Sequence, residues 1–226
     1  MAKARRNVAD CRETGAGFIC NMNEMVLRRI PLVLTLMALL AVCAAAQVIE
    51  YEANGKKYQT LTRDGLTIIV THMPNNVAGF GLVQVSVANG STIYWTVRPE
   101  EFSYVKEGVS ATAISADDVV NLLLAHGSHS DVMKLVTSYE STLYGIPHMR
   151  STNGYEQRRQ NAYTTGVPAK LEAAAIASAI ALAQTRIPPG QSTDGAIFVP
   201  LAHEKALTGG RLVVHVEGRT FEFNPD

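Results

Sequence analysis

The chain has 226 residues, and its 20 lysines and arginines balance its 20 aspartates and glutamates. From residue 47 onward it carries 14 basic and 17 acidic residues, so this part is slightly acidic. That balance argues against a general nucleic-acid binder or a binder of anionic membranes, because both need a surplus of positive charge.

A secretory signal peptide is predicted over residues 25–46. Arg28 and Arg29 precede an apolar run of about 12 residues, and Ala44–Ala46 offers a small-residue cleavage site. The apolar run is too short for a membrane-spanning helix, which needs roughly 20 apolar residues. We therefore expect an exported protein, periplasmic or extracellular, with no transmembrane segment after cleavage.

The beginning and the end of this leader each leave an alternative open. Residues 1–24 fit no part of a signal peptide, so we expect a mis-assigned extension ahead of a true start at Met25. An unusually long leader is the alternative. Leu40 lies at the right distance before Cys43 for a lipoprotein anchor, but Val42 stands where that motif needs a small residue. A lipid anchor at Cys43 is therefore the less favoured interpretation.

All three cysteines, Cys11, Cys20 and Cys43, precede residue 47. Disulfide bonds therefore cannot hold the mature chain together, and it must bury an apolar core of its own. Residues 47–226 are numerous enough to do so as one domain. We expect a single domain over that range.

The first half of this domain has the patterns of short antiparallel strands. Asn54-Gly55 and Asp64-Gly65 are hairpin-turn signals between β-prone segments. Apolar and polar residues alternate over Val83–Ala88 and over Ile93–Val97, and Phe102–Val105 indicates a further strand. A period of two predicts strands with one buried and one solvated face, and it places the single tryptophan in the core.

The middle of the domain changes to a helical period. Ser115, with Asp118 three residues later, is a helix-start signal, and Gly127 suits the end of that helix. A second helix is expected with Ser130 as its N-cap and Gly145 near its end. Its apolar stripe consists of Val132, Leu135, Val136, Tyr139 and Leu143.

A third helix is expected to begin at Pro168 and to end before Pro188. Strand patterns then return at Ala196–Val199, Leu212–Val216 and Phe221–Phe223. These strands must pair with the first set, because a lone hairpin is marginally stable in water. We expect a mainly β fold with an α insertion, namely an immunoglobulin-like β-sandwich interrupted by a three-helix segment at about residues 115–187.

Four segments, Pro189-Gly190, Asp194–Pro200, Arg211–Val214 and Gly218–Phe223, resemble the C-terminal end of uncharacterised exported bacterial proteins. Those proteins pair a β-sandwich with a helical insertion, so the resemblance implies the same layout here. They have no agreed activity, so the resemblance implies neither catalytic residues nor a cofactor.

The densest polar cluster in the sequence is formed by His126, His129 and Asp131. Two histidines that bind one metal from a helix usually stand four residues apart. These two are three apart, and Gly127, which breaks helices, lies between them. We expect no metal site here, and the alternative is a metal-binding protein or metal-dependent enzyme that uses this region.

No other pattern indicates catalysis. The sequence has no Gly-x-Ser-x-Gly elbow, no phosphate-binding loop and no dinucleotide fingerprint. His72-Met73 and His148-Met149 offer groups that suit copper, but neither pair has further ligands arranged around it. We expect no enzymatic activity and no cofactor.

A basic and aromatic group lies between the second and third expected helices, in a polar stretch with little periodicity. It consists of Arg150, Tyr155, Arg158, Arg159 and Tyr163. Tyrosine and arginine are enriched in interaction hot spots, so these residues are candidate partner contacts, and a solvated linker is the alternative. We therefore expect a non-enzymatic binding or structural module of the cell envelope. Its partner, an unknown envelope protein or polymer, would bind through the helical insertion.

Overall fold

Eleven strands and four α-helices occur in the residues that a computed structural model describes, namely 47–145, 151–162, 167–201 and 206–224. The strands are β1 (Ile49–Ala53), β2 (Lys56–Arg63), β3 (Leu66–His72), β4 (Phe80–Asn89), β5 (Trp95–Val97), β6 (Phe102–Lys106), β7 (Val109–Thr112), β8 (Thr185–Ile187), β9 (Ser192–Pro200), β10 (Arg211–Val216) and β11 (Arg219–Phe223). The helices are α2 (Ala116–His126), α3 (His129–Leu143), α4 (Tyr155–Ala162) and α5 (Ala169–Ile180). They belong to one compact unit, Ala46–Asp226.

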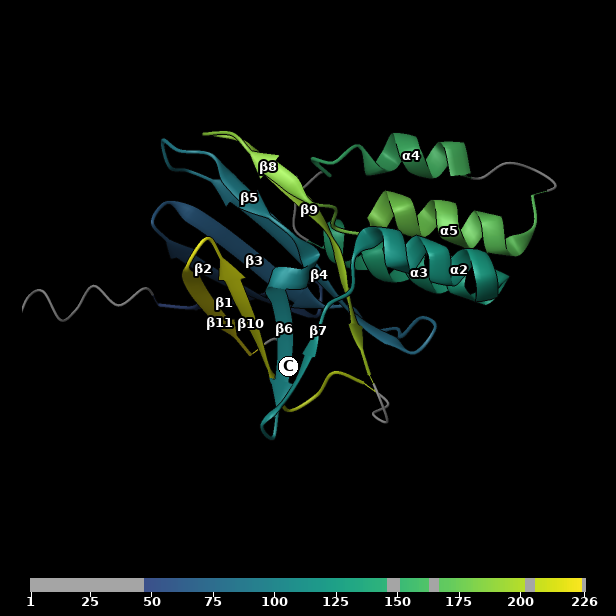
Figure 1. The fold of residues 1–226 in the computed structure, drawn as a ribbon, viewed down its shortest axis with the longest axis horizontal. Coiled ribbons are helices and arrows are strands. Elements are labelled where there is room, and N and C mark those ends of the chain that lie inside the picture. Colours follow the sequence, from purple (N-terminus) through teal and green to yellow (C-terminus); the bar gives the residue numbers. More distant parts are fainter. Residues whose placement is uncertain (1–46, 146–150, 163–166, 202–205, 225–226) are drawn as a thin grey trace, which may run out of the picture. The chain divides into compact units, whose positions relative to one another are not determined.

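The strands form three antiparallel sheets (Figure 1). The largest has the order β1-β2-β3-β4-β9, the second has the order β11-β10-β6-β7, and the third pairs β5 with β8. Helices α2 to α5 follow one another between β7 and β8. Figure 1 shows them gathered on the side of β4 and β9.

The predicted hairpin turns are confirmed. Asn54 and Gly55 have φ angles of 49° and 69° and join β1 to β2, whose ends pair at Ala53 and Lys56. Asp64 and Gly65 have φ angles of 50° and 80° and join β2 to β3. Two successive positive φ angles match the right-handed twist of the flanking strands, which explains the Asn-Gly and Asp-Gly sequences.

Two apolar cores lie on opposite faces of the five-stranded sheet. One is shared with the four-stranded sheet and includes Val85 and Phe221, whereas the other is shared with the helices and includes Leu82 and Tyr139. β4 and β9 are therefore buried on both faces. The expectation that the polar positions of β4 face solvent is wrong, because helices cover that side and Gln84 is only 4% exposed.

Local side-chain chemistry fixes where the helices begin. The predicted cap of α2 is confirmed, since Ser115 Oγ accepts a hydrogen bond from Asp118 N at 3.1 Å. The predicted cap of α3 at Ser130 is wrong. Ser128 holds that position in a capping box with Asp131, because its side chain accepts from Asp131 N while Asp131 accepts from Ser128 N.

The helical segment contains four helices where three were expected. The additional helix, α4, lies in the polar stretch that shows little periodicity in the sequence. Tertiary contacts compensate for the weak local pattern, since Tyr155 and Ala162 are both buried.

The mainly β character with helices is confirmed, but the immunoglobulin-like order is not. In that fold the chain crosses between two sheets early, whereas here β1 to β4 are successive neighbours in one sheet. Within the described residues, no helix is both long and apolar enough to cross a membrane.

Candidate functional site

The carboxylate of Asp194 lies inside the unit, where β9 meets the helices, and the residue is only 2% exposed. It accepts hydrogen bonds from Tyr139 Oη at 2.5 Å, Thr152 N at 2.5 Å and Thr152 Oγ1 at 2.7 Å. Ser151 Oγ lies 3.1 Å from the same carboxylate. Asn153 Nδ2 donates to the backbone oxygen of Asp194 at 2.6 Å. Asp194 thus holds α3 and the loop before α4 against β9.

The hydrogen bond from Tyr139 is available across the physiological pH range. Burial raises the pKa of Tyr139 far above its usual value, and the neighbouring Asp194 carboxylate raises it further. The phenol therefore stays protonated and donates to the Asp194 carboxylate.

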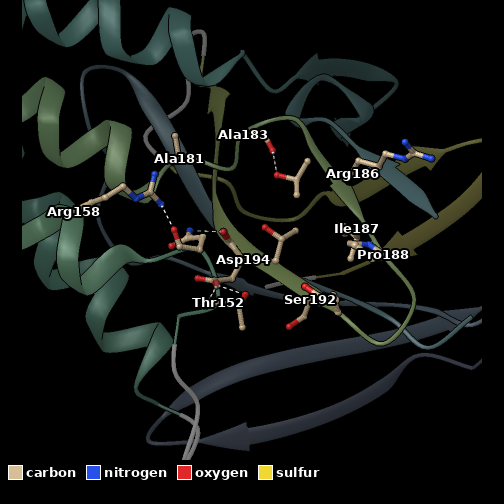
Figure 2. Close-up of a pocket in the computed structure, with 13 residues that line it drawn as sticks. Thr152, Arg158, Ala181, Ala183, Arg186, Ile187, Pro188, Ser192 and Asp194 are labelled. Carbon is tan, nitrogen blue, oxygen red and sulfur yellow. Dashed lines mark hydrogen bonds between the residues drawn. The ribbon is translucent and has the colours of Figure 1, made fainter. Parts of the chain in front are cut away.

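A pocket of about 370 Å³ opens beside Asp194 (Figure 2). The edge of β9 from Ser192 to Asp194 forms one wall. Residues between Ala181 and Pro188, including those of β8, form the facing wall. Thr152, Asn153 and Arg158 close the pocket on the side of α4.

One end of this pocket is closed by direct backbone contact. Ala181 forms a parallel bridge with Ala196, and Leu182 N donates to the oxygen of Ala196 at 2.9 Å. A Cβ on Gly195 would lie 2.6 Å from Leu182 Cα, so the approach requires a residue without a side chain. Beyond this contact the two segments separate, and the pocket lies between them.

Two arginines line the pocket. One is held by backbone hydrogen bonds, and the other stacks on an aromatic ring. Arg158 donates through Nη1 to Ser178 O and through Nη2 to Asn153 O, both at 3.0 Å. Its Nε is buried and has no hydrogen-bond partner among the described residues. The guanidinium of Arg186 lies 4.2 Å from the centre of the Tyr94 ring. Figure 2 shows Arg158 directed toward Asp194 and Arg186 directed away from it.

The pocket is equipped for binding through hydrogen bonds and positive charge. In the described part of the chain, neither Arg158 nor Arg186 forms an ion pair with an acidic side chain. The two oxygens of Asp194 already accept several hydrogen bonds, so its carboxylate is a structural anchor. The lining residues include hydroxyl groups on Thr152, Thr185 and Ser192.

The predicted contact residues fall into three groups. Arg158 lines the pocket. Arg150 and Tyr163 lie outside the described residues. Tyr155 and Arg159 hold α4 to α3: Tyr155 Oη donates to Glu140 at 2.9 Å, and Arg159 forms an ion pair with the same carboxylate. Tyr155 is 0% exposed, so the expectation that its ring is available to a partner is wrong.

The histidine region does not assemble into a cluster. His126 ends α2, and His129 is 73% exposed and lies 3.8 Å from Glu172. Asp131 serves the capping box of α3. Across the described ranges, no three histidine, cysteine, aspartate or glutamate side chains are grouped so as to hold a metal ion. Met73 is buried in the helical core, and His148-Met149 lies outside the described residues.

Asp194 and its donors were not predicted as site residues. One signal is available in the sequence, because Asp194 stands two residues before the apolar strand expected at Ala196–Val199. A buried carboxylate must be paired or hydrogen-bonded. Its donors lie more than 40 positions away in the chain, so the sequence gives no indication of which residues they are.

The sequence matches no protein-family model, and comparison with curated proteins and with solved structures gave no match either. The resemblance of the segments after Pro189 to exported bacterial proteins therefore stays an expectation. The function has to be inferred from the pocket and its surroundings.

Proposed function

We propose that this protein is an exported, non-enzymatic binding module of the cell envelope, and that its pocket beside Asp194 binds a ligand with an anionic group. The observation that carries this proposal is the guanidinium of Arg158. It is directed into the pocket, its Nε is buried without a partner, and no carboxylate in the described residues forms an ion pair with it.

The surrounding charges favour an anion. Asp194 is the acidic residue of the pocket lining, and its oxygens already accept hydrogen bonds from Tyr139 and Thr152. Arg158 supplies a positive charge inside the lining, and Arg186, whose guanidinium lies over Tyr94, carries a second charge near it. A guanidinium presents its donors in a planar fork that matches carboxylate and phosphate oxygens.

The size and setting of the pocket fit a small ligand or the end of a polymer. A volume of about 370 Å³ lies in the lower part of the range usual for ligand sites.

We also propose that the two larger sheets act as a β-sandwich scaffold and that the helical insertion carries the ligand site. The buried bonds from Tyr139 and Thr152 to Asp194 support this division, because they fix insertion residues against β9.

Small anions are expected to stabilise the purified protein against heat. A ligand at ten times its Kd adds about 1.4 kcal/mol to the free energy of unfolding. The test is a thermal-shift series with acetate, succinate, inorganic phosphate and glucuronate, against neutral glucose, with ionic strength held constant by sodium chloride.

Arg158→Gln should abolish the stabilisation by anions, whereas Arg211→Gln should retain it. Arg211 is the matched control because its guanidinium is half exposed and lies 3.5 Å from Glu222, away from the pocket lining. No stabilisation by any anion, or equal stabilisation in Arg158→Gln, would show that the pocket does not bind anions.

Export predicts that the native protein begins between Ala44 and Val48, because the three alanines Ala44–Ala46 follow the apolar run. N-terminal sequencing of protein from the organism's envelope and culture fluid is the measurement. An intact Met1 or Met25 would contradict export through this leader. A blocked, lipid-modified Cys43 would instead favour an anchored protein.

A further inference from the structure

We propose that the ligand is the C-terminal end of an extended peptide, which pairs with the outer edge of β9 and places its carboxylate on Arg158. This inference rests on the proposed function, because it names the ligand of the same pocket. It draws on two further observations, namely the open backbone edge of β9 and the position of Arg158 along that edge.

The pairing of β9 with β4 determines which backbone groups point into the pocket. Asn89 N donates to Gln191 O at 2.9 Å, and Gly190 N donates to Asn89 O at 2.7 Å. In an antiparallel pair, successive residues point their backbone groups alternately toward and away from the partner strand. With Gln191 directed toward β4, the backbone groups of Ser192 and Asp194 are directed to the outer edge. The Asp194 oxygen there already accepts from Asn153 Nδ2, so both groups of Ser192 and the N–H of Asp194 are the ones offered to a peptide.

Bonds observed farther along β9 agree with this alternation. On its outer side, Leu182 N donates to Ala196 O, and Ile114 N donates to Phe198 O. Between Ser192 and Asp194, β9 has no neighbouring strand on that side within the described residues, since it ends the order of its sheet. The pocket lies along this open stretch.

The open stretch has the dimensions of a short peptide. Three residues of a strand span about 10 Å, at roughly 3.3 Å per residue. An exposed sheet edge binds an extended peptide through main-chain hydrogen bonds, and side-chain pockets add specificity. The backbone N–H of Ser192 and of Asp194 are the donors on this wall.

Arg158 fixes where the carboxylate lies. Its Nη2 donates to Asn153 O, and Asn153 Nδ2 donates to Asp194 O, so this guanidinium is tied to the Asp194 end of the open stretch. A peptide whose carboxylate meets Arg158 therefore runs parallel to β9, with its preceding residues toward Ser192. The bonds to Ser178 O and Asn153 O use one N–H on each Nη, so each Nη keeps a second N–H for the carboxylate, and the buried Nε has no partner in the described residues.

Apolar surface lies outside the pocket lining, next to Arg186 of the facing wall. Arg186 lies at the rim over the ring of Tyr94, and both Tyr94 and the adjacent Ile93 are about half exposed, at 51% and 55%. We infer that a peptide extending past Ser192 and over this wall would place an apolar side chain on this surface. The chemistry of the site thus selects a peptide with a free C-terminus and an apolar upstream residue.

Isothermal titration of the purified protein tests the inference with defined probes. The reference probe is acetyl-Leu-Ala-Ala with a free C-terminal carboxylate. The comparison probes are the same peptide with a C-terminal amide, the same peptide methylated on its backbone nitrogens, sodium acetate and glucuronate. We expect the free acid to bind at least tenfold more tightly than each comparison probe, and Arg158→Gln to remove the difference between acid and amide.

The titrations with the peptides and the anions use the unaltered protein. They therefore test the peptide inference even if Arg158→Gln unfolds. Equal affinity for acid and amide, or for acetate and the acid peptide, overturns the inference. Binding of acetate with no gain from the peptide overturns it while the anion-binding function stands. Tighter binding of glucuronate assigns the pocket to a sugar acid instead. If none of the anions binds, both proposals fail.

Discussion

Replacing Asp194 with alanine is expected to lower the free energy of unfolding by about 3–5 kcal/mol. The change removes an acceptor shared by Tyr139 and Thr152. Tyr139 is fully buried, so its hydroxyl would lose a charged acceptor in a place that water reaches poorly. Hydrogen bonds to charged groups contribute about 1.5–3 kcal/mol each, and two or more are lost. Urea unfolding followed by far-ultraviolet circular dichroism measures the effect.

A double-mutant cycle separates this network from simple cavity formation. Tyr139→Phe alone should cost about 1–2 kcal/mol, because Asp194 keeps its bonds from Thr152. The double variant, Tyr139→Phe with Asp194→Ala, should cost less than the sum of the two single changes by about 1 kcal/mol, since no phenol is then left without an acceptor. Strictly additive costs would mean that the two side chains do not stabilise one another.

Replacing Trp95 with alanine is expected to cost about 3–5 kcal/mol as well, through a different mechanism. The indole is 2% exposed, packs in the core shared by the two larger sheets, and donates from Nε1 to Ser91 Oγ at 2.9 Å. Its removal leaves a cavity that the surrounding strands can fill only in part. Circular dichroism must follow the unfolding of this variant, because Trp95 is the single tryptophan.

Ile93 supplies the control for Trp95. It lies two residues earlier in the same alternating pattern, yet it is 55% exposed, so Ile93→Ala should change the stability by less than about 0.5 kcal/mol. The emission of Trp95 in the unaltered protein gives an independent check. A spectrum typical of water-exposed indole in the folded state would contradict the burial on which this prediction depends.

The features that could be predicted from the sequence are those fixed by neighbouring residues. The turns at Asn54-Gly55 and Asp64-Gly65 depend on backbone conformations within two positions, and the cap at Ser115 depends on one hydrogen bond to Asp118. The apolar stripe of α3 was predicted for the same reason, since helical geometry places those residues on one face. The cap of that helix was misplaced by two residues because Ser128 and Ser130 both suit the position.

Features that depend on distant contacts could not be predicted. β9 was expected only over its apolar residues, and its extension back to Ser192 depends on pairing with β4, more than 100 positions earlier. The alternation of Ile93 and Trp95 suggested that both are buried, but β5 begins only at Trp95, and Ile93 lies in the exposed segment before it.

Of the residues that line the pocket, the sequence pattern indicates only Arg158 as a contact residue. Arg158 was grouped with Tyr155 and Arg159 because all three lie in a polar, aromatic stretch. The structure separates them: Glu140 on α3 engages Tyr155 and Arg159, whereas Arg158 is directed to the pocket. Asp194 was missed because its partners come from α3 and the loop before α4, and no local pattern connects those segments.

The position of a bound anion tests most directly whether the pocket beside Asp194 is the binding site. The measurement is a two-dimensional amide NMR titration of the isotope-labelled protein with succinate and, separately, with inorganic phosphate. Binding in the pocket predicts that the largest shifts fall on Thr152, Arg158 and Ser192, and that they saturate. Shifts centred on the exposed Arg211 instead, or no saturable shift at any residue, would contradict it.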